Sequence, residues 1–522
     1  MSAKEKDSKT RLEDYISLGW YSLLLCVMFE LMLLPAVGNV MFMVYAGFAA
    51  KPHSCGPHDF THIVSSKLAC DRLKTLQSNS SCVAEFTWEF ESVNKDWGYT
   101  CENAQIVKNS VSIQMAGIMI GSILFGQISD MFGRKPSMLF CMFACAVLNL
   151  ASSFTQDLIW FTVLRTLIGV FNGGHIVVYV VYCVESLPKQ HRFWINTVIT
   201  WSPNMIFVAG IAYLSNNWRM FARVLSAVVV PGFLICLYVY ESPRFLIRKG
   251  NIKEAKRIMT GILKFDRNED YDKEKLNEIL EKEHQLIQEA SGSKNYHLLH
   301  IFSTWTFMKY TFAVSFGFLS MSIINYGLLF NMETVDGSIY MNNMYIGVVR
   351  FAINIVVALV EYRTKLGRKL IHLIGFTPII LCSLFMLIIA ILGKQAEFAI
   401  YTRAAIMIVC GVISQLYITN GLCTTELFPT PIRNLAFSFS QFMNRLGSVA
   451  APQLFFLAEL WTPLPYLTMV ILAGLDLFFF EFLLPETKGK PLSDHMPSSE
   501  ECLFRRRNKV EEKTKENVEI EA

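Results

Sequence analysis

The sequence predicts an all-α membrane protein with twelve transmembrane helices in two repeated halves of six. Hydrophobic residues make up 53% of the 522 residues and charged residues only 17%, whereas a soluble domain carries about 25% charged residues. Apolar runs long enough for a helix to cross the hydrocarbon core, roughly 20 residues, recur along the whole chain. Finally, charged residues in the loops of the first half recur at matching places in the second half.

The runs are too long for the strands of a closed barrel and lack the period-two alternation of such strands, which excludes a β-barrel. The first run contains Pro35 and is too long for a cleavable signal peptide, so we expect it to remain as the first span. The predicted spans are residues 18–46, 107–129, 137–155, 158–181, 193–214, 220–240, 304–330, 344–362, 370–392, 399–422, 435–458 and 464–484.

These spans divide the chain into five parts. They are an N-terminal segment, a first half that includes the polar insert 47–106, a charged linker, a second half and a charged tail. Their predicted limits are 1–17, 18–240, 241–303, 304–484 and 485–522. In the linker, Asn251 can cap an amphipathic helix, and a second charged helix is expected over 270–290.

The orientation follows from Lys and Arg in the short loops, which concentrate on the cytoplasmic side. Loops 130–136, 183–194, 361–369 and 424–434 together carry nine basic residues, whereas the loops on the opposite side carry only Arg219 and Lys394. Both termini and the linker are therefore expected to be cytoplasmic, and the insert is expected to be extracellular, most simply at the plasma membrane.

The insert has the chemistry of an external segment. It contains four cysteines, and their three alternative pairings stay open at the sequence level. It also contains the Asn79-Ser80-Ser81 sequon, so Asn79 is predicted to be glycosylated. The disulfide candidates are Cys55, Cys70, Cys82 and Cys101.

The two halves repeat each other in four places, in order and at a slowly growing offset. Gly133-Arg134-Lys135 returns as Gly367-Arg368-Lys369, at an offset of 234. The other matched pairs are Arg165 with Arg403, Glu185 with Glu426, and Glu241 with Glu486, at offsets of 238, 241 and 245. Such a duplication of six spans gives two parallel halves.

Several motifs resemble a known family. GQISDMFGRK at 126–135 resembles the loop motif GxxxDxxGRK of the major facilitator superfamily. ESPRFL at 241–246, PETKG at 485–489 and TELFPTPIRN at 425–434 resemble motifs of the organic cation, anion and carnitine transporters of the solute carrier type. The long Cys-bearing insert is similar to theirs and is absent from typical sugar porters. The resemblance implies the major facilitator fold and a secondary or facilitative transporter.

The sequence departs from the family pattern at three positions. Thr364 stands where the second-half loop motif has an acid, Asn325 where anion transporters often have Tyr, and Val356 where they tend to have Lys. The first departure predicts a weaker second loop motif, and the other two weaken a simple assignment as an anion transporter.

The resemblance assigns a gating role to charged residues near the predicted cytoplasmic ends. We expect them to form a charge network that joins helices while the transporter faces outward, although plain positive-inside topology is the alternative. The candidates are Asp130, Arg134, Lys135, Arg165, Glu185, Glu241 and Arg244, with Arg368, Arg403, Glu426, Arg433 and Glu486 as the second copy.

Arg445 is the main candidate for substrate binding. The segment NRLGSVAAP at 444–452 resembles the eleventh span of anion and carnitine transporters, which place Arg there, whereas cation transporters place Asp. A charge inside a span costs about 2.5–3.5 kcal/mol on insertion scales and so needs a reason. A cavity arginine can bind a carboxylate or sulfate. Alternatively, it pairs with Glu30 and only stabilises the fold.

Other candidates supply aromatic walls or neutral hydrogen bonds to an amphiphilic ligand. Arg350, about one turn into its predicted span, is instead expected to reach the outer surface by snorkelling, and Asp476 is expected to be structural. The further binding candidates are Tyr326, Asn325, Asn39, Trp201, Gln415 and Tyr417.

The favoured function is a carrier of small organic anions or carnitine-like zwitterions by alternating access. The partners would be the organic ion, the bilayer and a coupling ion, Na⁺ or H⁺, or a counter-transported anion. An organic cation transporter, with Glu30 as cation partner, is the alternative, followed by a sugar porter or a non-transporting sensor. No nucleotide, metal or catalytic motif is present, so no enzyme, cofactor, metal site or nucleic-acid partner is predicted.

Overall fold

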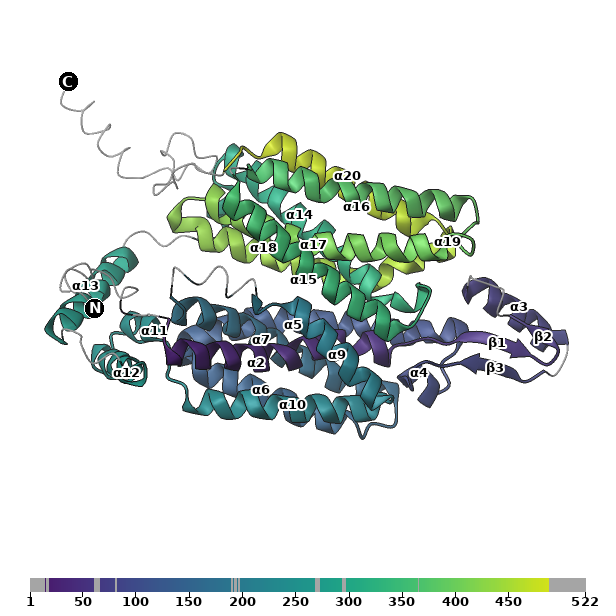
Figure 1. Cartoon of the computed structure of the whole chain (residues 1–522), viewed down its shortest axis with the longest axis horizontal. Helices are drawn as coiled ribbons and strands as arrows, with labels where there is room; N and C mark the ends of the chain where they lie inside the picture. Colours follow the sequence, from purple (N-terminus) through teal and green to yellow (C-terminus); the bar gives the residue numbers. More distant parts are fainter. Residues whose placement is uncertain are drawn as a thin grey trace, which may run out of the picture.

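A computed structural model describes residues 15, 18–60, 66–79, 82–188, 191, 195, 198–267, 273–292, 297–364 and 366–487. Long helices run side by side in two groups, and a small mixed domain projects from one end while three short helices lie at the other (Figure 1). The first group is built from residues before the linker and the second from residues after it.

The first group begins with α2, which continues through Pro35, and ends with α10. Asp157 caps α7 by accepting the backbone N–H of Trp160, and Asn217 caps α10 by accepting that of Arg219. The helices are α2 (Trp20–Ala46), α5 (Ala104–Phe132), α6 (Arg134–Ser152), α7 (Leu158–Ser186), α9 (Trp201–Ser215) and α10 (Trp218–Tyr238).

The second group has the same number of long helices. Thr304 caps α14 through the backbone N–H of Phe307. The helices are α14 (Trp305–Phe330), α15 (Ile339–Arg363), α16 (Arg368–Ile391), α17 (Ala399–Leu427), α18 (Thr430–Ala450) and α20 (Leu464–Leu483), with the short η3 (Leu298–Phe302), η4 (Met332–Thr334), η5 (Ala451–Phe456) and α19 (Leu457–Leu460) between them.

Ten of these helices are long and apolar enough to cross a membrane, among the residues that the structure describes. The two other predicted spans correspond to α9 and α18. The helix α9 begins at Trp201 and has 15 residues, and α18 carries a polar face. The predicted span 435–458 is not one helix, because the chain changes to the tighter η5 at Ala451, beside Pro452, which cannot donate a backbone hydrogen bond.

The helices α5 and α7 approach each other closely because glycines face the partner's backbone. A Cβ atom at Gly121 would collide with the carbonyl oxygen of Val170, and one at Gly173 with the carbonyl oxygen of Ile118. Small residues at helix crossings are the usual device for close packing in membranes. This close packing fixes the position of α7 relative to α5.

The insert 47–106 forms a three-stranded sheet with helices beside it. Cys55 is bonded to Cys82 and Cys70 to Cys101, which selects one of the three pairings that the sequence left open. Strand β1 lies between β2 and β3, antiparallel to both. The elements are β1 (Lys51–Cys55), β2 (His58–Asp59), α3 (Ser66–Asn79), β3 (Ala84–Thr87), α4 (Val93–Asp96) and η2 (Cys101–Asn103). The sequon begins at the last residue of α3, and its two serines lie outside the described residues.

The linker contains α11 (Pro243–Arg248), α12 (Ile252–Phe265) and α13 (Lys273–Gly292). The predicted cap is confirmed, since the side chain of Asn251 accepts the backbone N–H of Glu254. The linker is fastened to the first half, because Asp266 accepts the backbone N–H of Tyr21 at 2.7 Å at the start of α2.

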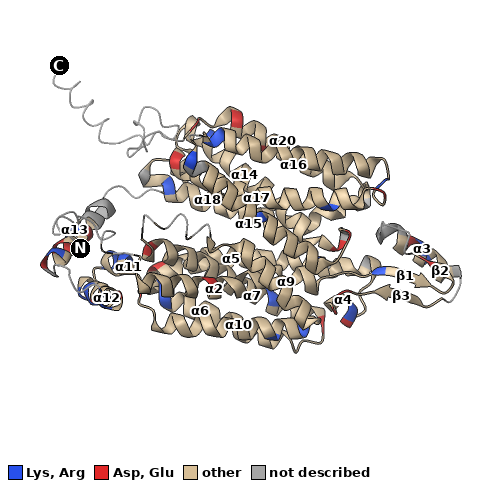
Figure 2. Ribbon diagram, viewed as in Figure 1, with Lys and Arg blue, Asp and Glu red and all other residues tan. Residues whose placement is uncertain are grey.

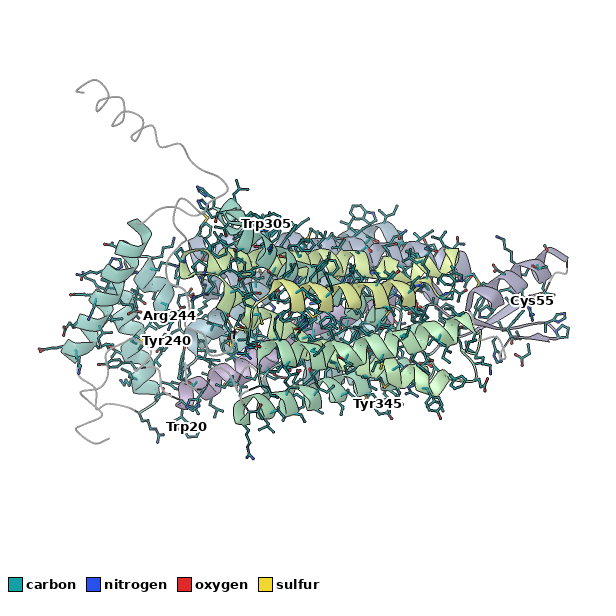
Figure 3. The ribbon with its side chains drawn as sticks, turned by 90° about the horizontal axis from the view of Figure 1, so that it is seen from above. Trp20, Cys55, Tyr240, Arg244, Trp305 and Tyr345 are labelled. Carbon is teal, nitrogen blue, oxygen red and sulfur yellow. A yellow bond between two sulfur atoms is a disulfide. The ribbon has the colours of Figure 1, made fainter. Side chains whose placement is uncertain are left out.

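The two ends of the molecule differ from its middle. Charged side chains gather around α11–α13 and the helix ends and are sparse along the middle of the bundle (Figure 2). Trp20 and Trp305, 64% and 59% exposed, lie at the same end as Arg244, and Cys55 lies at the opposite end (Figure 3).

Candidate functional site

Arg134 is the centre of a charge cluster at the end of the first half that carries the linker. Its side chain is 3% exposed. Its guanidinium lies 2.8 Å from Asp130 Oδ1 and 3.2 Å from Glu185 Oε1, which joins α5, α6 and α7. Asp130 also pairs at 2.8 Å with Arg248 of α11, which attaches the linker to the same cluster.

Glu241 completes this cluster by capping α6. Its carboxylate accepts the backbone N–H groups of Arg134 and Lys135 at 3.1–3.2 Å and that of Ser242 at 2.9 Å. A carboxylate at a helix N-terminus satisfies orphan donors and complements the helix dipole. Burial raises the pKa of the Glu241 carboxyl above its usual value, and the backbone hydrogen bonds act in the opposite direction.

The second half repeats several of these contacts. Arg368 pairs with Glu426 at 3.1 Å. Glu486 accepts the backbone N–H groups of Arg368 at 2.8 Å and Lys369 at 3.2 Å, as Glu241 does in the first half. The Nζ of Lys369 donates to the carbonyl of Glu481, as that of Lys135 donates to the carbonyl of Leu237.

The second cluster lacks one component of the first. Thr364 occupies the place of Asp130, and its hydroxyl donates to the carbonyl oxygen of Val360 at 2.7 Å. Thr487 instead donates to Glu426 at 2.6 Å. Asp130 and Glu185 both pair with Arg134. In the second half Arg368 pairs with Glu426, and the place of Asp130 is occupied by a neutral threonine.

Four of the candidate gating residues show none of the ion pairs described above for the clusters at Arg134 and Arg368. Arg165 lies 20 residues before Glu185 on α7, which is about 30 Å along the helix, and Arg403 lies over the ring of Tyr345 near the far end of α17. Arg433 donates to the carbonyl oxygen of Phe428 at 3.2 Å, where the chain turns from α17 into α18. Arg244 lies half-buried on α11. The structure does not bring Arg165 or Arg403 into the charge clusters.

Arg165 instead belongs to a buried polar cluster with Asn39 and Asn149. The arginine is 0% exposed and donates to the Asn149 side chain at 2.9 Å and to the Asn39 carbonyl at 3.1 Å. It also lies 3.8 Å from the centre of the Phe42 ring. Asn149 donates to the side chain of Asn39 at 2.9 Å, so Asn39 is engaged within the protein.

A second group of polar side chains lies in the middle of the second half. Tyr417 on α17 interacts electrostatically with Tyr326 on α14, Arg350 on α15 and Arg445 on α18. Among the described residues, neither arginine is ion-paired, and the buried side-chain oxygen of Asn325 has no hydrogen-bond partner. We call Tyr417, Tyr326, Arg350 and Arg445 the arginine–tyrosine cluster.

Arg350 does not reach the outer surface, contrary to the sequence-based expectation. It is 8% exposed, and its guanidinium lies 3.8 Å from the sulfur of Met205 on α9. The helix α15 begins at Ile339 rather than near 344, because the polar residues Asn342 and Asn343 are buried within it. Arg350 is therefore about 17 Å into the helix, too deep to snorkel outward.

The remaining binding candidates are placed separately from Arg445. Glu30 is half-buried and accepts a hydrogen bond from Asn204 at 2.8 Å. Gln415 is 7% exposed on α17, and Trp201 is partly buried as the first residue of α9. The predicted alternative of a Glu30–Arg445 pair does not occur in this conformation.

Polar contacts join the two halves near the end that carries the insert. Lys108 on α5 lies 2.7 Å from Oε1 of Glu333, which is part of η4. The same ammonium donates to Asn331 at 2.7 Å. Glu89 of the insert accepts the backbone N–H of Ile339 at 2.9 Å. Gln453 of η5 also donates to Ser112 of α5, at 3.0 Å. The charge clusters at the other end are built from contacts within each half.

No group of three or more His, Cys, Asp or Glu side chains suited to a metal ion occurs in the described part of the chain. The arrangement consists of two packed helix groups, a polar cluster between helices and charged clusters at the helix ends. It is suited to a carrier whose halves rock about a central site.

The chain belongs to the family of sugar (and other) transporters, whose model matches residues 72–496. The chain is thus a major facilitator superfamily transporter and not an enzyme. Its relatives are distant members of the organic cation and anion transporters. Solute carrier family 22 member 16 of Xenopus laevis is 28% identical over 414 residues, covering 78% of this chain and 71% of the relative.

Two further relatives cover a similar share of the chain. The organic cation transporter protein of Drosophila melanogaster is 26% identical and covers 81% of this chain and 76% of its own length. Solute carrier family 22 member 6-B of Xenopus laevis is 26% identical, and the match covers 78% of this chain and 73% of the relative. Their names include both cation and other solute carriers, so they leave the charge of this chain's substrate open.

Solved structures with the same fold confirm the predicted fold class. A D-xylose–proton symporter superposes with a TM-score of 0.61 at 15% identity, covering 90% of this chain and all of the other. The inward open conformation of the E. coli xylose transporter superposes with a TM-score of 0.60 at 16% identity, covering 89% and 98%. At these identities the likeness establishes the fold alone.

Sequence reasoning missed three features of these sites. The ion pair between Lys108 and Glu333 joins segments 225 positions apart, and no motif marks it. Arg248 lies two residues beyond the ESPRFL motif. Arg350 was visible as a charge within a span, and an earlier helix start, indicated by the buried asparagines, would have placed it inside the bundle.

Proposed function

We propose that this protein carries small organic anions or carnitine-like zwitterions across the membrane by alternating access. The observation that carries the proposal is the arginine–tyrosine cluster. Tyr417 interacts electrostatically with two guanidinium groups, those of Arg350 and Arg445, and neither arginine has an acidic partner among the described residues. Arg350 is buried and Arg445 is half-buried. Charges inside a protein are normally paired, because an uncompensated charge is costly to remove from water. An anionic substrate would supply the missing partner.

The chemistry of the cluster fits a carboxylate or sulfate attached to an apolar or aromatic body. A guanidinium offers two parallel N–H donors to such a group. Tyr326 stacks on Phe330, with ring centres 5.7 Å apart, and gives an aromatic wall on the same side. The amide of Asn325 and the hydroxyl of Tyr417 add neutral hydrogen bonds, which fix the ligand's orientation.

The contacts between the halves support a conformation that is open towards the cytoplasm. The linker and the two charge clusters lie at the end that the basic loops assign to the cytoplasm. The ion pair between Lys108 and Glu333 closes the opposite end. During alternating access the outer end would open and the cytoplasmic end would close. The clusters at Arg134 and Arg368 hold the helix ends of each half in place during this change.

Organic cations are the second candidate, because Glu30 is a half-buried acid on α2 that accepts a hydrogen bond from the neutral Asn204. A cation would contact this carboxylate from the first half. Uptake of labelled p-aminohippurate, carnitine and tetraethylammonium in one expression host separates these substrates. The proposal expects uptake of the first two, reduced in Arg445→Ala and Arg350→Ala. Uptake of tetraethylammonium alone, reduced in Glu30→Gln, would establish the second candidate instead.

A further inference from the structure

A buried acid and a buried imidazole face each other inside the second half, apart from the arginine–tyrosine cluster. Asp476 on α20 and His372 on α16 are both 0% exposed, and Oδ1 of the acid lies 3.9 Å from Nε2 of the histidine. Ser320 on α14 donates to Oδ2 of Asp476 at 2.8 Å. Asn420 on α17 is the fourth residue of this group. Both Asn420 and Asp476 lie against Gly317 of α14, since a Cβ atom built on Gly317 would be 2.7 Å from Nδ2 of Asn420 and 3.0 Å from Oδ1 of Asp476.

The groups around Asp476 are closely packed yet poorly satisfied. Among the described residues, Asp476 Oδ1, both ring nitrogens of His372 and both amide atoms of Asn420 have no hydrogen-bond partner. The imidazole lies flat against the ring of Phe480, with ring centres 3.5 Å apart. Buried polar groups in native proteins are nearly always hydrogen-bonded, so several unsatisfied groups in one place need an explanation.

No other charged side chain contacts Asp476 on the four helices that surround it. On α16 and α20 the next charged groups are Lys369 and Glu481, which face each other at 3.9 Å nearer the helix ends. On α17 the nearest titratable side chains are the hydroxyl of Tyr417 and the buried thiol of Cys423, each three residues from Asn420. Between Tyr310 and Tyr326, α14 has no titratable residue. The pair of Asp476 and His372 must therefore balance its own charge.

The charge balance of the pair is fixed by one proton. Without it, a carboxylate and a neutral imidazole leave a net charge of −1 within the membrane-spanning bundle, which is costly. With it, the pair is neutral overall, either as a carboxylic acid beside an imidazole or as a carboxylate beside an imidazolium. The basic nitrogen opposite the acid favours a proton over a metal cation, which would be surrounded by oxygen ligands.

We propose that Asp476 and His372 form a proton-binding site that takes up one proton from water and releases it during the transport cycle. This inference rests on the proposed transport function. Because both side chains are fully buried here, the proton exchanges only when the helices around the pair move. The helices α14 and α17 also carry residues of the arginine–tyrosine cluster, and Asn420 lies one turn from Tyr417. A movement of either helix would therefore change both sites.

The direct test needs no substrate. Infrared difference spectra of the purified full-length protein, recorded between about pH 5 and pH 9, detect protonation of a buried carboxylic acid or imidazole. The wild-type protein should show a titrating band that Asp476→Asn abolishes and His372→Gln shifts along the pH axis. Ser320→Ala, which removes a hydrogen bond but keeps both titrating groups, is the matched control and should retain the band.

Two results would overturn the proposal. The first is an identical pH difference spectrum for the wild-type protein and a folded Asp476→Asn variant. The second is a band that responds to replacing choline chloride by sodium chloride at fixed pH, which would assign the site to a metal cation. Elution as a single species from a sizing column shows that each variant is folded.

A transport measurement links the site to function. In liposomes of phosphatidylcholine and phosphatidylglycerol, uptake of labelled p-aminohippurate should depend on an imposed pH gradient, and Asp476→Asn should abolish that dependence. Uptake by Asp476→Asn that keeps the wild-type response to the gradient would contradict the proposal. If wild-type protein carries no organic ion at all, the proposed function fails, while the infrared result still decides whether the pair binds a proton.

Discussion

Lys108 and Glu333 form an ion pair that joins the two halves of the molecule, with the Nζ of the lysine 2.7 Å from Oε1 of the glutamate. The side chains are 20% and 9% exposed, so the pair is only partly screened by water. Asn331 accepts a second hydrogen bond from the same ammonium at 2.7 Å. A contact that exists only while the outer ends are together biases the equilibrium between conformations.

Breaking this pair should favour opening of the outer end. In Lys108→Ala, the loss of a charge-assisted contact of about 1.5–3 kcal/mol should shift the equilibrium roughly ten-fold or more. Spin labels at Leu214 and Leu460, exposed residues of the first and second halves, should report longer distances in the variant. The reversed pair Lys108→Glu with Glu333→Lys should restore the short distance. Unchanged distances in Lys108→Ala would exclude the pair as a closing contact.

The cluster around Arg134 should matter for transport but not for delivery of the protein to the membrane. Asp130→Asn and Arg134→Ala each remove contacts that join α5, α6, α7 and α11, so we expect uptake to fall at least ten-fold at normal surface abundance. Cell-surface biotinylation beside uptake separates the two effects. Normal uptake by both variants would show that the cluster has no gating role.

The second half offers a gain-of-contact version of this test. Thr364→Asp places an acid at the position that corresponds to Asp130, three residues before Gly367 and near Arg368. The substitution should slow exchange between conformations by stabilising the second cluster, whereas Thr364→Asn should not. Equal transport rates for the two variants would contradict the structural equivalence of the two clusters.

Glu241 should make the stability of the protein pH-dependent in a defined direction. Burial raises the pKa of its carboxyl above the ordinary value of 4.5. The folded state therefore binds the proton more readily than the unfolded state, and the contribution of Glu241 to the free energy of unfolding grows as the pH falls from 7 towards 4.5. The melting temperature of the wild-type protein minus that of Glu241→Gln should rise over this window. A difference that shrinks as the pH falls would contradict the assignment.

The insert should be an autonomous, oxidised cap on the outer end. Each disulfide closes a loop of 27 or 31 residues, which is worth about 3–4 kcal/mol in the loop-entropy model. Cys70→Ser with Cys101→Ser should therefore lower the melting temperature, and Asn79→Gln should remove a glycosidase-sensitive mass shift without that loss. A wild-type protein that shows no glycosidase-sensitive shift in a glycosylating host would contradict the external placement of the sequon.

The fold and the charge clusters were accessible from sequence because they rest on local patterns. Long apolar runs define the spans, and the match of Glu185 with Glu426 and of Glu241 with Glu486 predicted pairs of sites that the structure shows as equivalent contacts. Arg165 and Arg403 also match between the halves, but their depth on a helix of 29 residues separates them from the clusters. A sequence repeat shows which residues of the two halves are equivalent, but it does not show where along the helix those residues lie.

The central site could be predicted only in part because it depends on side-chain orientation across different helices. Arg445 carried a motif, but Arg350 is brought to the same tyrosine by a helix that begins earlier than its hydropathy indicates. The partners of Asn39 and Glu30 are Asn149, Arg165 and Asn204, neutral or buried groups that no linear pattern pairs with them. Such contacts follow from packing alone.

Charge selectivity at Arg445 tests the central claim most directly. The measurement is initial uptake of labelled p-aminohippurate and tetraethylammonium by the wild-type protein, Arg445→Ala, Arg445→Asp and the double variant Glu30→Gln/Arg445→Ala, at matched surface abundance. Losing an ionic hydrogen bond of about 1.5–3 kcal/mol should weaken apparent affinity for the anion roughly 10- to 150-fold in Arg445→Ala. Arg445→Asp should abolish anion uptake and admit the cation. Wild-type protein that carries only tetraethylammonium, with an affinity unchanged in Arg445→Ala, would contradict the account.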